Sequence, residues 1–296
     1  MEVTTCLNCN KLVKINNVLE ILNPDFKNPY TIFECPNCKI KKTWPIPGDL
    51  SSLYSPHLFN APDNKLKYYF KRILNYWEIK RFIHYTKSQE FLDVGAGFGE
   101  FSEVLYKMGY SVHSVDAFLE RPYYIKLISE IPYHQFNYET IEIQDPHIIK
   151  NKVVILRHVL EHIKNPYQFL QKFILNGASH FYIVVPNADS LEMKIFRQHA
   201  LLWGVPYHLW HFGGNSLKTL LTQLGLEIIV LGYDTIPTIM FNIRQYFLSK
   251  KSLRFLNKIL PQDSISYILS MPLNLFFPNN VIWVIAKVNK NANRKH

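Results

Sequence analysis

The sequence predicts an α/β fold built on a parallel sheet, with a small separate module at its N-terminus. Two observations carry this prediction. A strand, a glycine turn, a helix and a second strand follow one another over residues 90–116, and four cysteines stand in two pairs before residue 40. The chain has 296 residues, of which 48% are hydrophobic. That length suffices for one large domain with an accessory module, or for two domains.

The cysteines form two Cys-x-x-Cys pairs, Cys6 with Cys9 and Cys35 with Cys38, and the chain has no other cysteine. Four thiolates at this spacing can close a tetrahedron around Zn²⁺. An iron centre, metal-free thiols, redox pairs and two disulfides are the alternatives, and a cytoplasmic setting disfavours stable disulfides. Coordination by sulfur alone leaves no open position for water or substrate, so we expect a structural zinc.

The predicted zinc ribbon spans residues 1–45 and is followed by a linker over residues 46–64. Val13–Ile15 and Tyr30–Phe33 are short β-prone runs between the cysteine pairs, and they predict small hairpins. The linker contains proline and glycine in turn-forming combinations.

A helix is expected next. Its apolar residues recur at helical spacing and are expected to cover the sheet: Leu66, Phe70, Ile73 and Trp77.

The stretch from Phe91 to Asp116 has the order of elements that builds a nucleotide-type cofactor site. Phe91–Val94 is an apolar run short enough for a buried parallel strand. Three alternating glycines follow, which let the backbone turn sharply and let a ligand approach the main chain. A helix is expected over Phe101–Met108, closed by Gly109. The next strand ends at Asp116, where a carboxylate can accept hydrogen bonds from both ribose hydroxyls of a nucleoside.

The glycine spacing discriminates between cofactors. Asp93, Gly95, Gly97 and Gly99 form Asp-x-Gly-x-Gly-x-Gly, which differs from the Gly-x-Gly-x-x-Gly of dinucleotide enzymes. The turn resembles motif I of class I S-adenosylmethionine-dependent methyltransferases. Three later segments resemble the quinone and sugar methyltransferase-like branch of that family, in the expected order: the Leu-Glu-His strand region at 153–166, the Pro-Asn strand at 181–187 and the His-Leu-x-His-Phe element at 207–212.

The resemblance implies a Rossmann-like, seven-stranded methyltransferase sheet over residues 65–286. It also implies a substrate-side insertion at about 235–278, and a flexible basic tail is expected at 287–296. S-adenosylmethionine is the implied cofactor. Asn137 stands where the family often has an acid beside the adenine. The implied cofactor contacts are Asp93, Gly95, Gly97, Gly99, Asp116, Asn137, Arg157 and His158.

The histidine element supplies the candidate catalytic residues, His208 and His211 with Tyr207 beside them. The protein aligns donor and acceptor in methyl transfer and, for a hydroxyl or carbon acid, removes a proton. Imidazole titrates near neutral pH and is suited to that task. Glu161 and His162 are the next candidates.

The net charge of +10 is compatible with an anionic partner, but the basic residues are scattered along the chain. No apolar run of about 18 residues predicts a transmembrane helix. The first residues also lack a signal-peptide pattern, so the cytoplasm is the expected location.

Three functions remain open from the sequence. The favoured one is methylation of oxygen or carbon on a small-molecule acceptor, a saccharide or a surface-glycan or secondary-metabolite precursor. An RNA methyltransferase that grips nucleic acid with its ribbon is the alternative, and salt-dependent RNA binding would support it. A non-enzymatic zinc-ribbon binding protein is the third.

Overall fold

The computed structural model of the chain describes residues 3–6, 8–14, 16–21, 29–46, 65–117, 123–126, 128–136, 146–250 and 263–289. It divides into two compact units. The ribbon unit comprises Met1–Gly48, Val185–Leu220 and Leu231–Trp283, and the sheet unit comprises Asp49–Val184, Leu221–Val230 and Val284–His296. Apart from Ile46, the expected linker lies outside the described residues.

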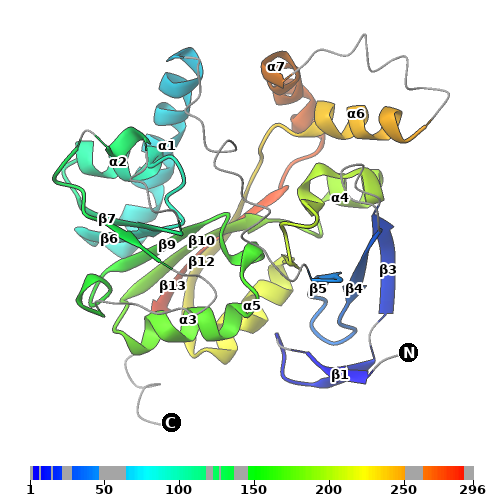
Figure 1. Ribbon diagram of the computed structural model, residues 1–296, viewed down its shortest axis with the longest axis horizontal. Helices are drawn as coiled ribbons and strands as arrows, with labels where there is room; N and C mark the ends of the chain where they lie inside the picture. The colour runs from blue at the N-terminus through cyan, green and yellow to red at the C-terminus, as the bar shows by residue number, and fades with distance from the viewer. Residues whose placement is uncertain are drawn as a thin grey trace. The chain divides into compact units, whose positions relative to one another are not determined.

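The large sheet has seven strands among the residues that the structure describes, in the order β12-β13-β10-β9-β6-β7-β8 (Figure 1). Their bounds are β6 Glu90–Val94, β7 Ser111–Asp116, β8 Tyr133–Gln135, β9 Val153–Arg157, β10 His180–Pro186, β12 Leu226–Asp234 and β13 Val281–Val288.

The central strands of this sheet are parallel. β6 pairs with β7 and β9, β7 with β8, and β10 with β9. The chain runs outward from β6 through β7 and β8, then returns to place β9 on the other side of β6. Ligands of open α/β sheets bind at the carboxyl ends of the strands beside such a reversal. The predicted α/β, Rossmann-like fold is confirmed.

Helices cover both faces of the large sheet. They are α1 (Lys65–Thr86), α2 (Glu100–Lys107) and α3 (Pro166–Leu175). On β10, Tyr182 stacks on Phe82 of α1 with ring centroids 4.7 Å apart, while its neighbour Phe181 meets Phe173 of α3 at 6.5 Å. Successive side chains of a strand point to opposite faces, so α1 and α3 lie on opposite sides of the sheet.

The expected orientation of α1 was wrong. Phe70, Ile73 and Trp77 were expected to face the sheet, but they are 41%, 56% and 66% exposed. The helix instead buries Ile79 and Phe82, both fully. Its apolar residues therefore form two faces, and the second one is turned to solvent.

The ribbon unit contains a four-stranded sheet in the order β11-β5-β4-β3 and a separate β1-β2 pair. The strands are β1 Val3–Thr5, β2 Leu12–Lys14, β3 Asn16–Ile21, β4 Tyr30–Glu34, β5 Lys41–Trp44 and β11 Trp210–His211. The short strands predicted between the cysteines are present, although Ile15 lies outside the described residues. β11 comes from the His-Leu-Trp-His-Phe element and pairs antiparallel with β5.

A small core joins the ribbon strands to the segment that follows β10. Ile21 and Ile32 from β3 and β4 pack with Met193, Leu202 and Trp203. Met193 belongs to α4 (Leu191–Phe196), and the chain continues to α5 (Gly214–Gln223), closed by Gly225 at φ 71°.

The insertion forms α6 (Ile239–Ser249) and α7 (Asp263–Leu273), with residues 251–262 outside the described ranges. A buried carboxylate anchors α6. Glu192 of α4 accepts hydrogen bonds from the side chains of Thr238, Asn242 and Asn280. The last strand reaches Val288, two residues beyond the expected end of the domain, and the basic residues from 290 onward are not described.

Candidate functional site

The glycine turn after β6 adopts the left-handed conformations that its sequence predicts. The φ angles of Gly95, Gly97 and Gly99 are 75°, 54° and 80°. The N–H of Gly95 donates to the carbonyl of Val115 at 2.8 Å, which fixes the start of the turn against β7. Residues with a Cβ adopt such angles only at a cost, so glycine is needed at these positions.

Asp116 closes the turn from the end of β7. It is buried, and its Oδ2 accepts the N–H of Gly97 at 2.7 Å while Oδ1 accepts the N–H of Ala117 at 2.7 Å. An acid at this position, at the end of the strand that follows the glycine turn, is the group that accepts ribose hydroxyls in nucleoside-binding folds of this kind.

The space beside the turn suits a bound nucleoside. A Cβ built on Gly97 would meet nothing within 4 Å, so the backbone there borders open space. S-adenosylmethionine requires three features of this part of the fold: a glycine turn, open space beside it, and a carboxylate at the end of the next strand. The residues present therefore fit that cofactor.

Asp93 lies behind the turn. Its buried Oδ2 accepts the hydroxyl of Ser102 at 2.6 Å, and Ser114 donates to Ser102 at 2.7 Å. Burial raises the pKa of the Asp93 carboxyl above its usual range. The geometry thus gives Asp93 the task of joining β6, α2 and β7 beneath the turn.

The guanidinium group of Arg157 binds side chains of the protein itself. It forms a bidentate ion pair with Glu78 of α1, with distances of 2.9 and 3.0 Å, and lies 4.2 Å from the centroid of the Phe101 ring. Glu78 also accepts the hydroxyl of Tyr182 at 2.9 Å. Glu78 was missed by the sequence analysis, although it is the single acid of α1, which was a usable signal.

His158 is exposed at the end of β9, with φ 54° and its Nδ1 3.4 Å from Glu161 Oε1. Its backbone N–H donates to Val184 at 2.8 Å. Asn137 lies outside the described residues, so its predicted adenine contact stays a prediction.

The two candidate histidines of the ribbon unit have different surroundings. His208 is half-buried, and its Nδ1 is 3.0 Å from the carbonyl of Leu202. A carbonyl only accepts, so Nδ1 carries the proton and Nε2 is the basic nitrogen of the neutral ring. Tyr207 beside it is also half-buried.

His211 is buried within the ribbon sheet. The hydroxyl of Thr43 donates to the carbonyl of His208 at 2.7 Å, so its oxygen accepts a proton from His211 Nε2 at 2.8 Å. The ring also meets Trp203 edge to face at 4.8 Å. Burial, then the neighbouring His208 and Lys41, lower the pKa of His211 well below its usual value. These contacts hold β11 against β5, so the contacts of His211 are structural ones.

The four cysteines come together, and all are buried and free of disulfides. Their sulfurs lie within 4.8 Å of one another. The Cys6–Cys38 and Cys9–Cys35 sulfur pairs are each 3.8 Å apart. A regular tetrahedron with metal–sulfur bonds of ~2.3 Å has edges of ~3.8 Å, so the cluster has the size of a zinc site.

The two cysteine turns share one backbone geometry. In each, the N–H of the first cysteine donates to the carbonyl five residues later, at 2.9 Å. The residue after the second cysteine is left-handed in both, with φ 56° at Asn10 and 62° at Lys39. The side chain of Asn8, which the sequence analysis did not single out, donates to Cys38 Sγ at 3.3 Å and to the carbonyl of Ser216 at 3.1 Å.

A parallel sheet with a strand-order reversal, a left-handed glycine turn and an acid on the next strand defines a class of nucleoside-cofactor enzymes. A sequence model of one family, described as a methyltransferase domain, matches residues 65–231. The match covers more than half of the chain, so the chain belongs to the methyltransferase domain family and is an S-adenosylmethionine-dependent methyltransferase.

Several solved structures resemble the chain over most of their length. A SAM-dependent methyltransferase from Archaeoglobus fulgidus is 20% identical, with a TM-score of 0.47 over 73% of this chain and 94% of the other. The YcgJ protein from Bacillus subtilis is 13% identical, with a TM-score of 0.46 over 69% and 93%.

The magnesium protoporphyrin IX methyltransferase of Synechocystis PCC 6803, solved with bound SAH, is 10% identical, with a TM-score of 0.45 over 78% and 90%. No curated protein sequence matches the chain.

None of the helices in the described residues is both long and apolar enough to span a membrane.

Proposed function

We propose that the chain transfers a methyl group from S-adenosylmethionine to an oxygen or carbon of a small-molecule acceptor of saccharide type. The hydrogen bond from the N–H of Gly97 to Asp116 supports the methyl-donor half of this proposal, because it places an acid directly at a left-handed glycine turn. The cofactor supplies an electrophilic sulfonium methyl group. The chain would hold its ribose hydroxyls through Asp116 and leave room for it at Gly97.

The acceptor half depends on proton removal when the nucleophile is a hydroxyl. His208 is the better candidate base of the two histidines, because its Nδ1–H is held by Leu202 and its Nε2 is the basic position. His211 already donates its Nε2 proton to Thr43 and is buried. Tyr207 stays a candidate for lining the acceptor.

The four-cysteine cluster is proposed to hold one structural zinc ion. The sulfur separations of 3.8 Å and the repeated backbone turns support it. All four positions would be filled by protein sulfur, so the metal would stabilise the ribbon and take no part in chemistry.

The donor site is tested by two substitutions and a matched control. Asp116→Ala and Gly97→Arg should each abolish S-adenosylmethionine binding in calorimetry, because one removes the ribose acceptor and the other fills the adjacent space. Gly109→Arg introduces the same left-handed strain, at φ 87° and also with open space, but away from the turn, so it should keep binding. Zinc content should be equal in all variants. Cofactor affinity that survived both turn variants would refute the assignment.

A further inference from the structure

A pocket of about 370 Å³ lies within the ribbon unit, at the ends of β10 and β12 and before β13. This volume is near the lower end of the about 300–1,000 Å³ typical of ligand sites. Its polar lining includes Asn187, Asp189, Asn215, Tyr233 and Asn279. None of these residues was singled out as a candidate from the sequence.

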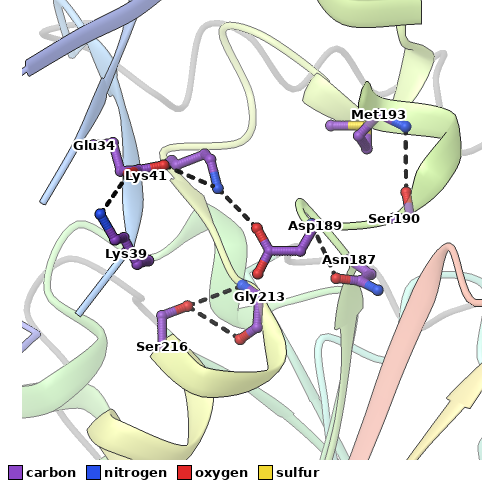
Figure 2. Close-up of polar contacts among 9 residues, drawn as sticks. All are labelled: Glu34, Lys39, Lys41, Asn187, Asp189, Ser190, Met193, Gly213 and Ser216. Atoms are coloured by element: carbon purple, nitrogen blue, oxygen red, sulfur yellow. Dashed lines mark hydrogen bonds and ion pairs between the residues drawn. The ribbon is translucent and has the colours of Figure 1, made fainter. Parts of the chain in front are cut away.

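Asp189 is the charged group of the pocket, and the ribbon holds it. Lys41 of β5 places its Nζ 2.9 Å from Asp189 Oδ1 and 3.4 Å from Glu34 Oε2, as Figure 2 shows. The Lys41 side chain is only 10% exposed, whereas that of Asp189 is 44% exposed. The lysine therefore fixes the carboxylate from behind while the carboxylate stays accessible.

Backbone contacts also position Asp189. Its N–H donates to Asn187 Oδ1 at 3.0 Å, and Asn187 donates to the carbonyl of Asn279 at 2.7 Å. A Cβ on Gly213 would lie 1.7 Å from Asp189 Oδ2, so only glycine allows the carboxylate to sit there. Figure 2 shows the carboxylate beside Gly213, at the start of α5.

Tyr233 of β12 also lines the pocket. Its hydroxyl reaches over Gly214, where a Cβ would lie 2.6 Å from it. The tyrosine is 45% exposed, so its ring and hydroxyl can both meet a ligand. Asn215 and Asn279 are also exposed. Together these side chains offer a carboxylate acceptor, amides that both donate and accept, and a phenol.

The charges select the class of ligand. The first turn of α5 would attract an anion, but Asp189 occupies that position with its own negative charge. Lys41 offsets the charge of Asp189 at 2.9 Å, so a free cation is not strongly favoured either. A neutral ligand with several hydroxyls satisfies carboxylate, amide and phenol at once, and one face of it can lie on the tyrosine ring.

We propose that this pocket binds the saccharide portion of the methyl acceptor, with Asp189 accepting its hydroxyls and Tyr233 lying against it. The role as acceptor site rests on the proposed function, whereas the binding itself does not. The ribbon then has a second task beyond stability, because Lys41 orients the pocket carboxylate.

The test uses the full-length chain and the methyl glycosides of glucose, galactose and mannose in saturation-transfer NMR. At least one glycoside should show transfer from the protein. Asp189→Asn and Tyr233→Phe should each weaken its binding about fivefold or more, as expected for one lost hydrogen bond. Tyr246→Phe removes the hydroxyl of a similarly exposed tyrosine on α6, outside the pocket, and should change nothing.

Calorimetry with S-adenosylmethionine and a zinc assay accompany each variant and should give wild-type values. The absence of binding by all three glycosides, or binding that both pocket variants leave unchanged, would overturn the pocket assignment. If the wild-type chain bound glycosides but not S-adenosylmethionine, the proposed methyl transfer would fail and the pocket would stand.

Discussion

His211 is a buried histidine that its surroundings keep neutral. The hydroxyl oxygen of Thr43 accepts a hydrogen bond from Nε2–H, and Trp203 meets the ring edge to face. Burial is the main reason that its pKa lies well below the usual value, followed by the charges of His208 and Lys41. The same residue in the unfolded chain would titrate at about pH 6.5.

This difference predicts a pH dependence of stability. Below about pH 6.5 the unfolded chain binds a proton at His211 that the folded chain does not. The contribution of His211 to the free energy of unfolding should therefore fall there by up to about 1.4 kcal/mol per pH unit and be constant above that pH. His211→Gln should reduce the loss seen between about pH 7.5 and about pH 5.5 in denaturant titrations. His84→Gln, at an exposed position, is the control. Equal pH profiles for wild type and His211→Gln would contradict the assignment.

The candidate site was predictable where its contacts are local in sequence. Gly97 and Asp116 belong to one strand-turn-helix-strand unit, and their spacing alone predicted that both would lie at one cofactor site. The hydrogen bond between them is a finding of the structure. The partners of Arg157 and His211 could not be predicted in that way. Glu78 and Thr43 come from distant elements, and only the folded sheet brings them to the two side chains.

At the scale of elements, α1 shows why a helical pattern can be assigned to the wrong face. Phe70, Ile73 and Trp77 have helical spacing, but so do the buried residues Ile79 and Phe82. Periodicity identifies a stripe without saying which neighbour it meets. Here the choice is made by the stacking of Phe82 on Tyr182 and by the ion pair of Glu78, both of which depend on β9 and β10.

Two alanine substitutions in α1 should therefore have opposite outcomes. Phe82→Ala removes a fully buried ring and should lower the free energy of unfolding by about 3–5 kcal/mol. Trp77→Ala removes a larger side chain that is 66% exposed and should change it by no more than about 0.5 kcal/mol. Chemical denaturation measures both. A cost at Trp77 comparable to that at Phe82 would mean that the exposed face is covered in solution.

At the scale of the whole molecule, the ribbon unit includes segments far beyond the four cysteines in the sequence. β5 pairs with β11, which lies far along the chain, and Lys42 sits 5.2 Å from the ring centroid of its partner Trp210. The sequence indicated a module over residues 1–45, because the metal pattern is confined there. A two-residue strand such as β11 is too short for its sequence pattern to predict which strand it pairs with. The segments that make up the ribbon unit were therefore known only from the structure.

This organisation predicts how the effects of removing the proposed zinc should extend through the ribbon unit. Structural zinc contributes on the order of 10 kcal/mol to small modules, far more than a two-residue strand pairing can replace. Cys38→Ser, or chelation of the wild-type chain, should therefore raise amide hydrogen exchange in β5 and also in β11, which lies outside the cysteine module. β6 and β9 serve as the internal control, and their protection should persist because they belong to the sheet unit.

Asn8→Ala tests the contact between the cysteine cluster and α5 without removing a proposed zinc ligand. It removes the hydrogen bonds to Cys38 Sγ and to the Ser216 carbonyl but leaves all four sulfurs in place. Zinc should stay bound, and faster exchange should be confined to the start of α5.

The chelation experiment has a clear contrary outcome. If chelation changed exchange only within residues 1–45, the pairing of β5 with β11 would not depend on the metal. The ribbon would then act as a separate module, and Lys41 would reach Asp189 without help from the zinc.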